Sequence, residues 1–483
     1  MDFVSVRFVI FMSFAILAFH LCSKKYRAKL IMPLLNAFFI LTFVKHPTEL
    51  WPFALFLVTG FWCIKLMERF PTKKNAALTI GAILTLFIYV KKYAFFSIVP
   101  FMRGVYLTIG LSYILFRILH ILIDIYGGAI KERFSALTFF NYTCMFLTFI
   151  AGPIQRFQEY QAVERNLGEK VPLKREDIRK DLSRIVNGYF KVTLLSPVFL
   201  FIFNEFFTRI DSARYEATSF ILCVVYTGAC FVYTLHLYCN VSGYMDIVVS
   251  LGRFLGLQLP ENFNKPFLSK SFLEFWSRWH ITLSNWFKFY VFNPIVKALI
   301  QRRNKAGLIP YYGVIAFFVV FFLVGVWHGS SPAFLIFGLF LGFGMSINKL
   351  YEVLLRRRLG KKAYARVCES RWHRALGSGL TYSYFSMGAT CIWMDFDKLM
   401  WLFRKIGIFG LLGVFLLGGL LAASVIALFS VLICWRDAGY ERLYFLGRNL
   451  YFRQGYLSLK AFILLLFLVS KSHSVPEFIY KAF

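Results

Sequence analysis

Long apolar runs separated by short polar stretches make up most of the chain. A membrane-spanning helix needs about 20 mostly apolar residues, and the runs that approach this length predict the spans. They cover residues 4–22, 30–44, 51–66, 76–90, 104–126, 134–154, 186–208, 217–239, 242–259, 311–327, 333–350, 376–394, 407–434 and 457–470. The pattern predicts an all-α, polytopic membrane helix bundle with about 11–14 membrane segments, some of them partial or re-entrant.

Four longer polar stretches interrupt the apolar runs, at 155–185, 260–310, 351–375 and 435–456. Each is rich in Lys or Arg, and such loops stay in the cytoplasm. Two loops on one side require an even number of crossings between them, yet three runs lie between the first two loops. We expect 242–259, which contains Asp246, to cross only part of the membrane. A second partial crossing is expected around Pro153, because the number of predicted spans before the loop 155–185 would otherwise place that loop outside the cytoplasm.

A histidine stands at the end of the most apolar of these runs. Residues 311–327 contain no charge and lead directly into His328. The alternation of spans predicts that the connection 328–332 faces away from the cytoplasm. An ionisable side chain at such a place is costly unless it faces a cavity, so His328 is a candidate functional residue. A histidine that only caps a helix turn is the alternative.

The stretch 272–290 has the periodicity of an amphipathic helix. One face would carry Phe272, Phe275, Trp276, Trp279, Leu283, Trp286, Phe287 and Tyr290, and the other Glu274, Arg278, Asn285 and Lys288. Lys265 and Lys270 precede it, and His280 lies at the edge of its apolar face. Such a helix is expected at the cytoplasmic interface, in contact with membrane lipids. Anchoring of the protein and binding of a substrate both explain it.

Composition supports a membrane protein and narrows the alternatives. Apolar residues make up 59% of the 483 residues and charged residues 16%, and the mean hydropathy is +0.63, which excludes a soluble globular protein. The net charge of +31 comes from basic clusters between apolar runs, so it indicates cytoplasmic loops and not nucleic-acid binding. The nine cysteines show no CxxC spacing, so neither a metal site nor a disulfide framework is predicted. The first run is expected to be a retained span.

Several motifs together resemble one family. The segment "NFNKPFLSKSFLEFWSRWHITLSNWFKFYVF" at 262–292, followed by "VGVWHG" at 324–329, resembles the membrane-bound O-acyltransferases, especially bacterial members that acylate cell-envelope polymers. Matches of the same kind are "IGLSYILFRILHILIDIYGG" at 109–128, "AGPIQR" at 151–156, "NGYFKVTLLS" at 187–196 and "YCNVSGYMDI" at 238–247. The family-like core covers about 105–350 of a single membrane domain, 1–483, and 376–483 adds further C-terminal spans.

The resemblance implies roles for particular residues. It makes His328 the catalytic residue and His280 a second functional polar residue, at the meeting point of a cytoplasmic and an outer funnel within about a dozen tilted helices. The resemblance departs at Asn240, because an acidic residue is common there in envelope-modifying relatives. Asn240, Ser242 and Asp246 are expected to be polar residues that line the tunnel.

Acyl transfer to a hydroxyl needs a base and a site that excludes water. A neutral imidazole suits the first task, and the absence of a GxSxG motif from the sequence favours direct transfer without an acyl-enzyme. Trp276, Arg278 and Trp279 are expected to bind the donor, with His280 holding it. Lys265, Lys270 and Lys288 should attract an anionic donor. No bound cofactor is predicted, and the co-substrate would be an acyl thioester, either acetyl-CoA or a phosphopantetheine carrier protein.

The sequence therefore predicts a membrane O-acyltransferase of the bacterial cytoplasmic (inner) membrane. We expect it to move an acyl group, acetyl in the first place, from a cytoplasmic thioester donor across the membrane to an extracytoplasmic polysaccharide or cell-wall polymer, together with a separate extracytoplasmic acyltransferase or acceptor protein. D-alanyl transfer from a carrier protein toward teichoic acid is the alternative, favoured by "FNKPFLSK". A transporter for an envelope lipid or glycan, and a membrane scaffold, are the alternatives outside enzymes.

Overall fold

A computed structural model describes residues 3–93, 108–166, 174–212 and 218–448, together with Ser458 and Lys460. These residues form helices and connections without a named strand, and one isolated bridge pairs Phe263 with Trp279. The predicted all-α class is confirmed. The chain folds into two compact units. One lies within Met1–Gly188 and Tyr244–Glu261, and the other within Tyr189–Gly243 and Asn262–Pro476.

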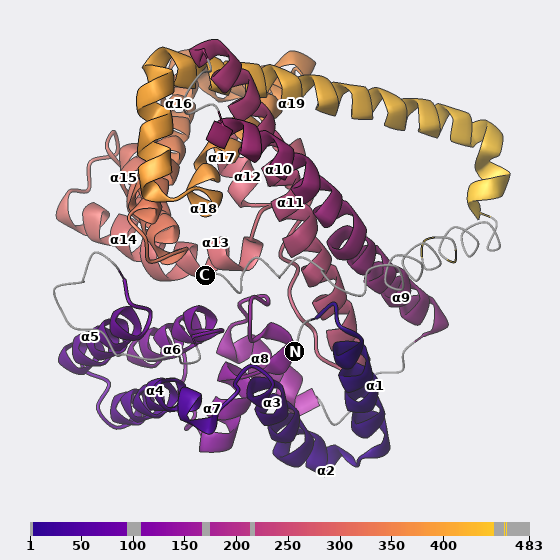
Figure 1. Cartoon of the computed structure of the whole chain (residues 1–483). Coiled ribbons are helices and arrows are strands. Elements are labelled where there is room, and N and C mark those ends of the chain that lie inside the picture. The colour runs from indigo at the N-terminus through magenta and orange to yellow at the C-terminus, as the bar shows by residue number, and fades with distance from the viewer. Residues whose placement is uncertain are drawn as a thin grey trace. The chain divides into compact units, whose positions relative to one another are not determined.

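The first unit is built from short and medium helices (Figure 1). In chain order they are α1 (Val6–Leu21), α2 (Lys24–Tyr26), α3 (Met32–Leu41), α4 (Trp51–Arg69), α5 (Lys73–Val90), α6 (Leu111–Tyr126), α7 (Ala136–Thr143), α8 (Phe157–Asn166) and most of α9 (Arg175–Phe190). Apolar side chains from α4, α5 and α6 pack together, as where Ile118 fills the space beside Gly60. The predicted spans 4–22, 51–66 and 76–90 therefore correspond to α1, α4 and α5.

The predicted continuous span 134–154 is wrong, because the chain leaves the helix after α7. The reason is Arg117 on α6, which is fully buried. Its guanidinium donates to the carbonyl groups of Tyr142, Thr143 and Thr148 at 2.7–3.0 Å. These carbonyl groups would be costly to bury without a partner. The backbone leaves the α-helix at Cys144, nine residues before Pro153, and the partial crossing expected around Pro153 stays a prediction.

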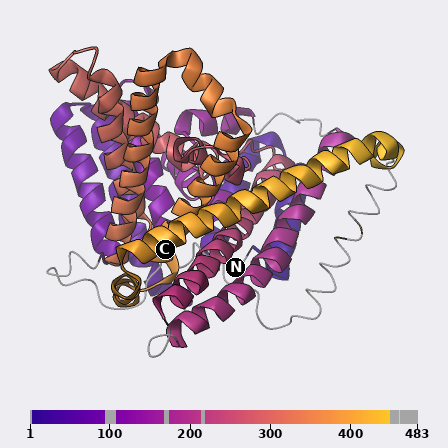
Figure 2. The ribbon, with the colours of Figure 1, turned by 90° about the horizontal axis from the view of Figure 1, so that it is seen from above.

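The second unit holds the longest helices. They are α10 (Ser196–Ser212), most of α11 (Ser219–Phe254), α12 (Phe272–Trp276), α13 (Ile281–Phe287), α14 (Asn293–Arg302), α15 (Ile309–Trp327), α16 (Ala333–Glu369), α17 (Arg371–Gly388), α18 (Thr390–Trp393) and α19 (Phe396–Arg448). Short π-helical segments precede α10 and α14, at Lys191–Leu195 and Lys288–Phe292. The long helix that turns from orange to yellow in Figure 2 is α19, which is bent at Gly407.

Two sequence boundaries are corrected by long helices. The runs 217–239 and 242–259 are not separate segments, since α11 continues without a break from Ser219 to Phe254 and its 36 residues form one helix. A helix of this length extends about 54 Å, and the merger leaves an even number of helices between the loops 155–185 and 260–310. The expected loop 351–375 is also wrong, because α16 continues to Glu369 and is interrupted only by a bend at Gly360.

Among the described residues, seven helices are long and apolar enough to cross a membrane. They are Pro47–Arg69, Lys73–Val90, Arg175–Ser212, Ser219–Phe254, Ile309–Trp327, Ala333–Glu369 and Phe396–Leu428. The shorter apolar helix Val6–Leu21 adds to this set. The polytopic architecture predicted from the apolar runs is therefore confirmed. The predicted span 457–470 lies outside the described residues except for Ser458 and Lys460.

Candidate active site

His280 occupies a sharp turn between two short helices. The predicted single helix 272–290 is wrong, because α12 ends at Trp276 and α13 begins at Ile281. His280 between them has a left-handed backbone, with φ 47° and ψ 51°. This conformation costs a non-glycine residue roughly 1–2 kcal/mol, and such strain is often found at functional sites. The turn places the imidazole in the interior, where His280 is 1% exposed.

Hydrogen bonds accepted by Asn262 hold this turn in place. The Oδ1 atom of Asn262, a fully buried residue, accepts from the backbone N–H of Thr282 at 3.0 Å and from its hydroxyl at 2.9 Å. The Asn262 carbonyl also accepts from the N–H of Ile281 at 3.0 Å. The neighbouring bridge between Phe263 and Trp279 closes the other side of the turn. The segment that starts at Asn262 thus fixes the backbone on both sides of His280.

His328 lies where α15 ends. The helix terminates at Trp327, and the Nδ1 atom of His328 donates to the carbonyl of Val324 at 2.6 Å. A carbonyl can only accept, so the proton is on Nδ1 and the neutral ring presents Nε2 as its basic nitrogen. The ring packs against Phe337 and is 9% exposed. Gly329 leaves room for the Phe334 ring, because an added Cβ would come within 2.1 Å of that ring and force it to shift.

The structure brings His280 and His328 together within the second unit. Burial and, as a smaller effect, the electrostatic interaction with His328 together lower the pKa of His280 to about 3. Both are almost completely removed from solvent. Two neutral imidazoles in an apolar surround can take up and hand on a proton while water is kept out.

Aromatic side chains surround the His280 turn. Trp276 packs on Phe321 of α15 with ring centroids 4.8 Å apart, and Trp279 stacks on Phe275 at 5.5 Å. Both predicted donor-binding tryptophans are buried. The Nε1 atom of Trp276 is buried without a hydrogen-bond partner among the described residues. Such an orphan donor is costly, and a carbonyl or sulfur atom of a substrate would satisfy it.

The predicted basic residues differ in their surroundings. Arg278 pairs with Glu274 on α12 at 2.6 Å, so its charge is already partly compensated. Lys265 and Lys288 are exposed and carry no ion pair with another described residue. Lys270 is half-buried and lines a separate cavity. The structure thus leaves Lys265 and Lys288 as the members of the set best placed to attract an anion from solution.

The predicted tunnel residues Asn240, Ser242 and Asp246 all lie on α11. Asn240 is fully buried and donates to the Ser196 hydroxyl at 3.4 Å, and Ser242 is 3% exposed. Asp246 belongs to the first unit, where Arg184 of α9 donates to it at 2.8 Å.

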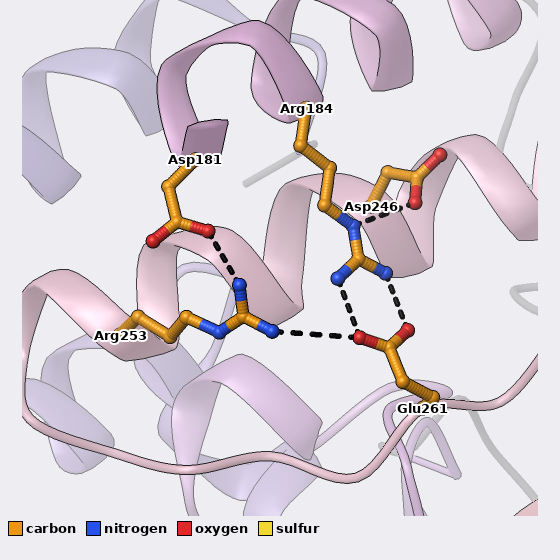
Figure 3. A network of polar contacts seen from close by, with 5 residues as sticks. All are labelled: Asp181, Arg184, Asp246, Arg253 and Glu261. Atoms are coloured by element: carbon orange, nitrogen blue, oxygen red, sulfur yellow. Dashed lines mark hydrogen bonds and ion pairs between the residues drawn. The ribbon is translucent and has the colours of Figure 1, made fainter. Parts of the chain in front are cut away.

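Figure 3 shows the polar network that contains Asp246. Arg184 also makes a bidentate ion pair with Glu261. Glu261 lies 3.6 Å from Arg253, and Arg253 donates to Asp181 at 2.7 Å. The network therefore links α9, the end of α11 and the segment after it. The Asp246 carboxylate already has a cationic partner in this network.

Asn262 and Arg117 were not identified by sequence reasoning. Asn262 stands at the start of the quoted segment 262–292, but an asparagine in a polar loop gives no signal of burial. Arg117 could have been found, since it is a lone arginine inside an apolar run and such residues are usually functional or structurally paired. Within the described residues, no group of three or more His, Cys, Asp and Glu side chains could hold a metal ion.

Comparison with known families agrees with this architecture. Residues 127–388, more than half of the chain and including both histidines, match the membrane-bound O-acyltransferase (MBOAT) family. The chain belongs to this family, and it is a multi-pass acyltransferase of the bacterial inner membrane, as the sequence predicted.

Several curated relatives are similar over part of their length. A teichoic acid D-alanyltransferase of Streptococcus thermophilus is 25% identical over 309 residues, which cover 62% of this chain and 70% of the relative. A probable alginate O-acetylase of Pseudomonas syringae pv. tomato is 28% identical over 52% of this chain and 44% of its own. A peptidoglycan O-acetyltransferase of Helicobacter pylori is 36% identical over 26% of this chain and 22% of its own. The chain thus matches less than half of the O-acetylating relatives.

Proposed function

We propose that this enzyme transfers an acetyl group from a cytoplasmic thioester donor to an extracytoplasmic polysaccharide or cell-wall polymer. The observation that carries the mechanism is the buried pair His280 and His328, with the proton of His328 fixed on Nδ1. Two of the three kinds of relative are named for O-acetylation of alginate or peptidoglycan. D-alanyl transfer is the second candidate, because a relative covered over 70% of its length is a teichoic acid D-alanyltransferase.

The reaction needs one proton to move twice. Nε2 of His328 removes the proton from the acceptor hydroxyl as the oxygen attacks the thioester carbonyl carbon. The carbon–sulfur bond then breaks, and the imidazolium returns the proton to the departing thiolate. An ester and a free thiol result, so atoms and charge balance without an acyl-enzyme. His280 and the Nε1 atom of Trp276 would hold the donor and stabilise negative charge on its carbonyl oxygen.

Donor and acceptor are proposed to approach from opposite faces of the membrane. The basic segment 260–310 is expected in the cytoplasm, where acyl thioesters are made, whereas the turn 328–332 is expected to face outward. Lys265 and Lys288 would draw an anionic donor to the cytoplasmic side. A separate extracytoplasmic acyltransferase or acceptor protein would then complete the modification of the polymer.

Two substitutions at His328 test the base. Loss of a general base removes about 10²–10⁴-fold of rate, so His328→Ala should lose acyl transfer and remain folded. His328→Asn retains an amide N–H that can donate to the Val324 carbonyl, and it should be equally inactive. His46→Ala, at an exposed histidine, is the matched control. Rescue of activity by His328→Asn would mean that His328 only caps the helix.

Sealed vesicles test the crossing of the membrane. Labelled acetyl-CoA is supplied on the cytoplasmic side and a soluble polysaccharide on the other, with and without an extracytoplasmic partner fraction. Label should reach the acceptor only across the membrane and only with the partner. Transfer confined to the cytoplasmic side would contradict the crossing. A pure transporter would show no thioester cleavage at all, and a D-alanyl enzyme would use a D-alanyl carrier protein but not acetyl-CoA.

A further inference from the structure

A large cavity lies in the second unit, apart from the two histidines. Its volume is about 980 Å³, and α12, α16 and α17 supply most of its walls. This is at the upper end of the range for small-molecule pockets, about 300–1,000 Å³. Neither His280 nor His328 lines it, so the proposed acyl transfer does not account for this space.

One end of the cavity is apolar and the other polar. At the apolar end, Tyr384 of α17 stacks on Phe340 of α16 with ring centroids 4.1 Å apart, and its hydroxyl donates to the Phe340 carbonyl. The two helices are consecutive in the chain and pack side by side here. The N-terminal part of α17 therefore lies near the later residues of α16. The polar end accordingly carries Glu352 and His373. Lys270, whose carbonyl abuts Gly377, belongs to the same end.

The polar end of the cavity carries a net positive charge. The carboxylates that line it are already compensated, Glu274 by Arg278 at 2.6 Å and Glu352 by Lys349 at 3.0 Å and Arg356 at 2.9 Å. Lys270 has no acidic partner among the described residues. The Nδ1 atom of His373 is buried and lacks a hydrogen-bond partner there. An anionic group would pair with the Lys270 ammonium and give the Nδ1 atom of His373 a hydrogen-bond partner.

The cavity also opens onto the outer surface of the helices. Ile347 and Leu376, which line it, are 62% and 51% exposed. Ile347 lies on α16, one of the helices apolar enough to cross a membrane, so an opening beside Ile347 is expected to face lipid. An amphiphile can therefore enter sideways from the bilayer, with its apolar part against Phe340, Leu380 and Met387.

We propose that this cavity binds one anionic phospholipid. Its phosphate lies at Lys270 and His373, and its acyl chains lie between α16 and α17. The sideways opening and the apolar depth favour a lipid over a water-soluble acyl thioester. A bound lipid would also fill space that otherwise leaves apolar side chains of the two helices without packing partners.

Native mass spectrometry of the purified full-length protein tests the proposal, with phosphatidylglycerol and phosphatidylcholine as probes. The wild type should retain one phosphatidylglycerol and bind it at least tenfold more tightly than phosphatidylcholine. Leu380→Trp should abolish retention by filling the cavity. Lys270→Glu combined with His373→Glu should abolish the preference for the anionic lipid. Leu416→Trp, at a 49% exposed position on α19 that does not line the cavity, should behave as the wild type.

Three results would overturn the proposal. They are equal binding of the two lipids by the wild type, full retention of phosphatidylglycerol by Leu380→Trp, and displacement of phosphatidylglycerol by acetyl-CoA, which would assign the cavity to the donor. Thermal unfolding in detergent identifies a misfolded variant. If Leu380→Trp does not fold, the double charge variant, which leaves the apolar walls unchanged, decides the question.

Discussion

At the residue scale, the candidate site depends on a few side chains that hold the backbone around each histidine. His280 has a left-handed backbone close to the buried Thr282. The backbone N–H and the hydroxyl of Thr282 both donate to the Oδ1 atom of Asn262. His328 is oriented by its own helix through the Val324 carbonyl. These contacts fix the protonated nitrogen of His328 and the backbone that carries His280, so their loss should affect the rate more than the affinity.

Asn262→Ala should lower kcat by up to about 100-fold, because small misplacements of reacting groups have costs of that order. The donor KM should change little. Asn262→Asp keeps the accepting oxygen and should restore most of the rate. Asn285→Ala, at an exposed asparagine on α13, is the control. A rise in KM with kcat unchanged would show that Asn262 serves donor binding and does not position His280.

His280 should make the protein sensitive to acid. Its pKa is lowered from 6.5 to about 3 by burial and then by His328, so the unfolded chain takes up a proton below pH 6.5 that the folded chain refuses. The free energy of unfolding should therefore fall by up to roughly 1.4 kcal/mol per pH unit from pH 6.5 toward 3. His280→Gln should reduce the slope by this one-proton contribution, measured as Tm in detergent from pH 7 to 4. His46→Gln should keep it, and identical slopes for all three proteins would contradict the assignment.

At the element scale, glycine contacts set the distance between α15 and α16, the helices on either side of the His328 turn. A Cβ on Gly325 would lie 2.2 Å from the Cα of Gly338, and a Cβ on Gly338 would lie 2.5 Å from the Phe322 carbonyl oxygen. The two helices therefore touch through their backbones. The position of His328 relative to Phe337 follows from this close packing.

Gly325→Ala should separate these helices and lower stability by about 1–3 kcal/mol, the usual range for overpacking. Gly313→Ala tests the same substitution in the same helix, where the nearest atom to the new Cβ is 3.7 Å away, and it should leave Tm unchanged or slightly raised. Thermal unfolding of both variants in detergent measures the difference. Equal stability of the two variants would refute the close-packing argument.

The segment 272–290 shows why an element can differ from its sequence pattern. Its apolar positions are spaced as on one continuous helix, and most of them are indeed buried. The helix nevertheless breaks at His280, because Asn262 and the bridge from Phe263 to Trp279 replace the helical hydrogen bonds there. Periodicity reports which side chains are buried, but it does not reveal a backbone partner elsewhere in the chain.

At the scale of the whole molecule, the proposed mechanism requires the His328 turn and the segment 260–310 to face opposite sides of the membrane. Single cysteines at Arg179, Asn285 and Ser331 test this in a chain whose nine native cysteines are replaced. An impermeant thiol reagent added to spheroplasts should label Ser331→Cys, and it should label Arg179→Cys and Asn285→Cys only after lysis. Labelling of Asn285→Cys in intact spheroplasts would reverse the predicted orientation.

The sequence by itself determined the class of protein, and it proposed the two histidines as functional residues. Apolar runs near the length of a bilayer, with basic clusters between them, are sufficient for a polytopic membrane protein. An ionisable side chain next to an uncharged run marks His328, because its burial would be too costly without a function. These features are local, so they can be recognised without knowing which segments meet.

Only the tertiary structure decided where the helices break and merge. Arg117 satisfies three carbonyl groups, two at the end of α7 and one beyond it, and so permits the break in 134–154. Asn262 does the same for the turn at His280, 18 residues further along the chain. An unpaired backbone group is too costly to bury, so a helix can end in an apolar surround only where a distant residue supplies its hydrogen bonds. Which distant residue supplies these hydrogen bonds depends on the fold, so the pattern of apolar residues along the sequence could not predict the helix ends.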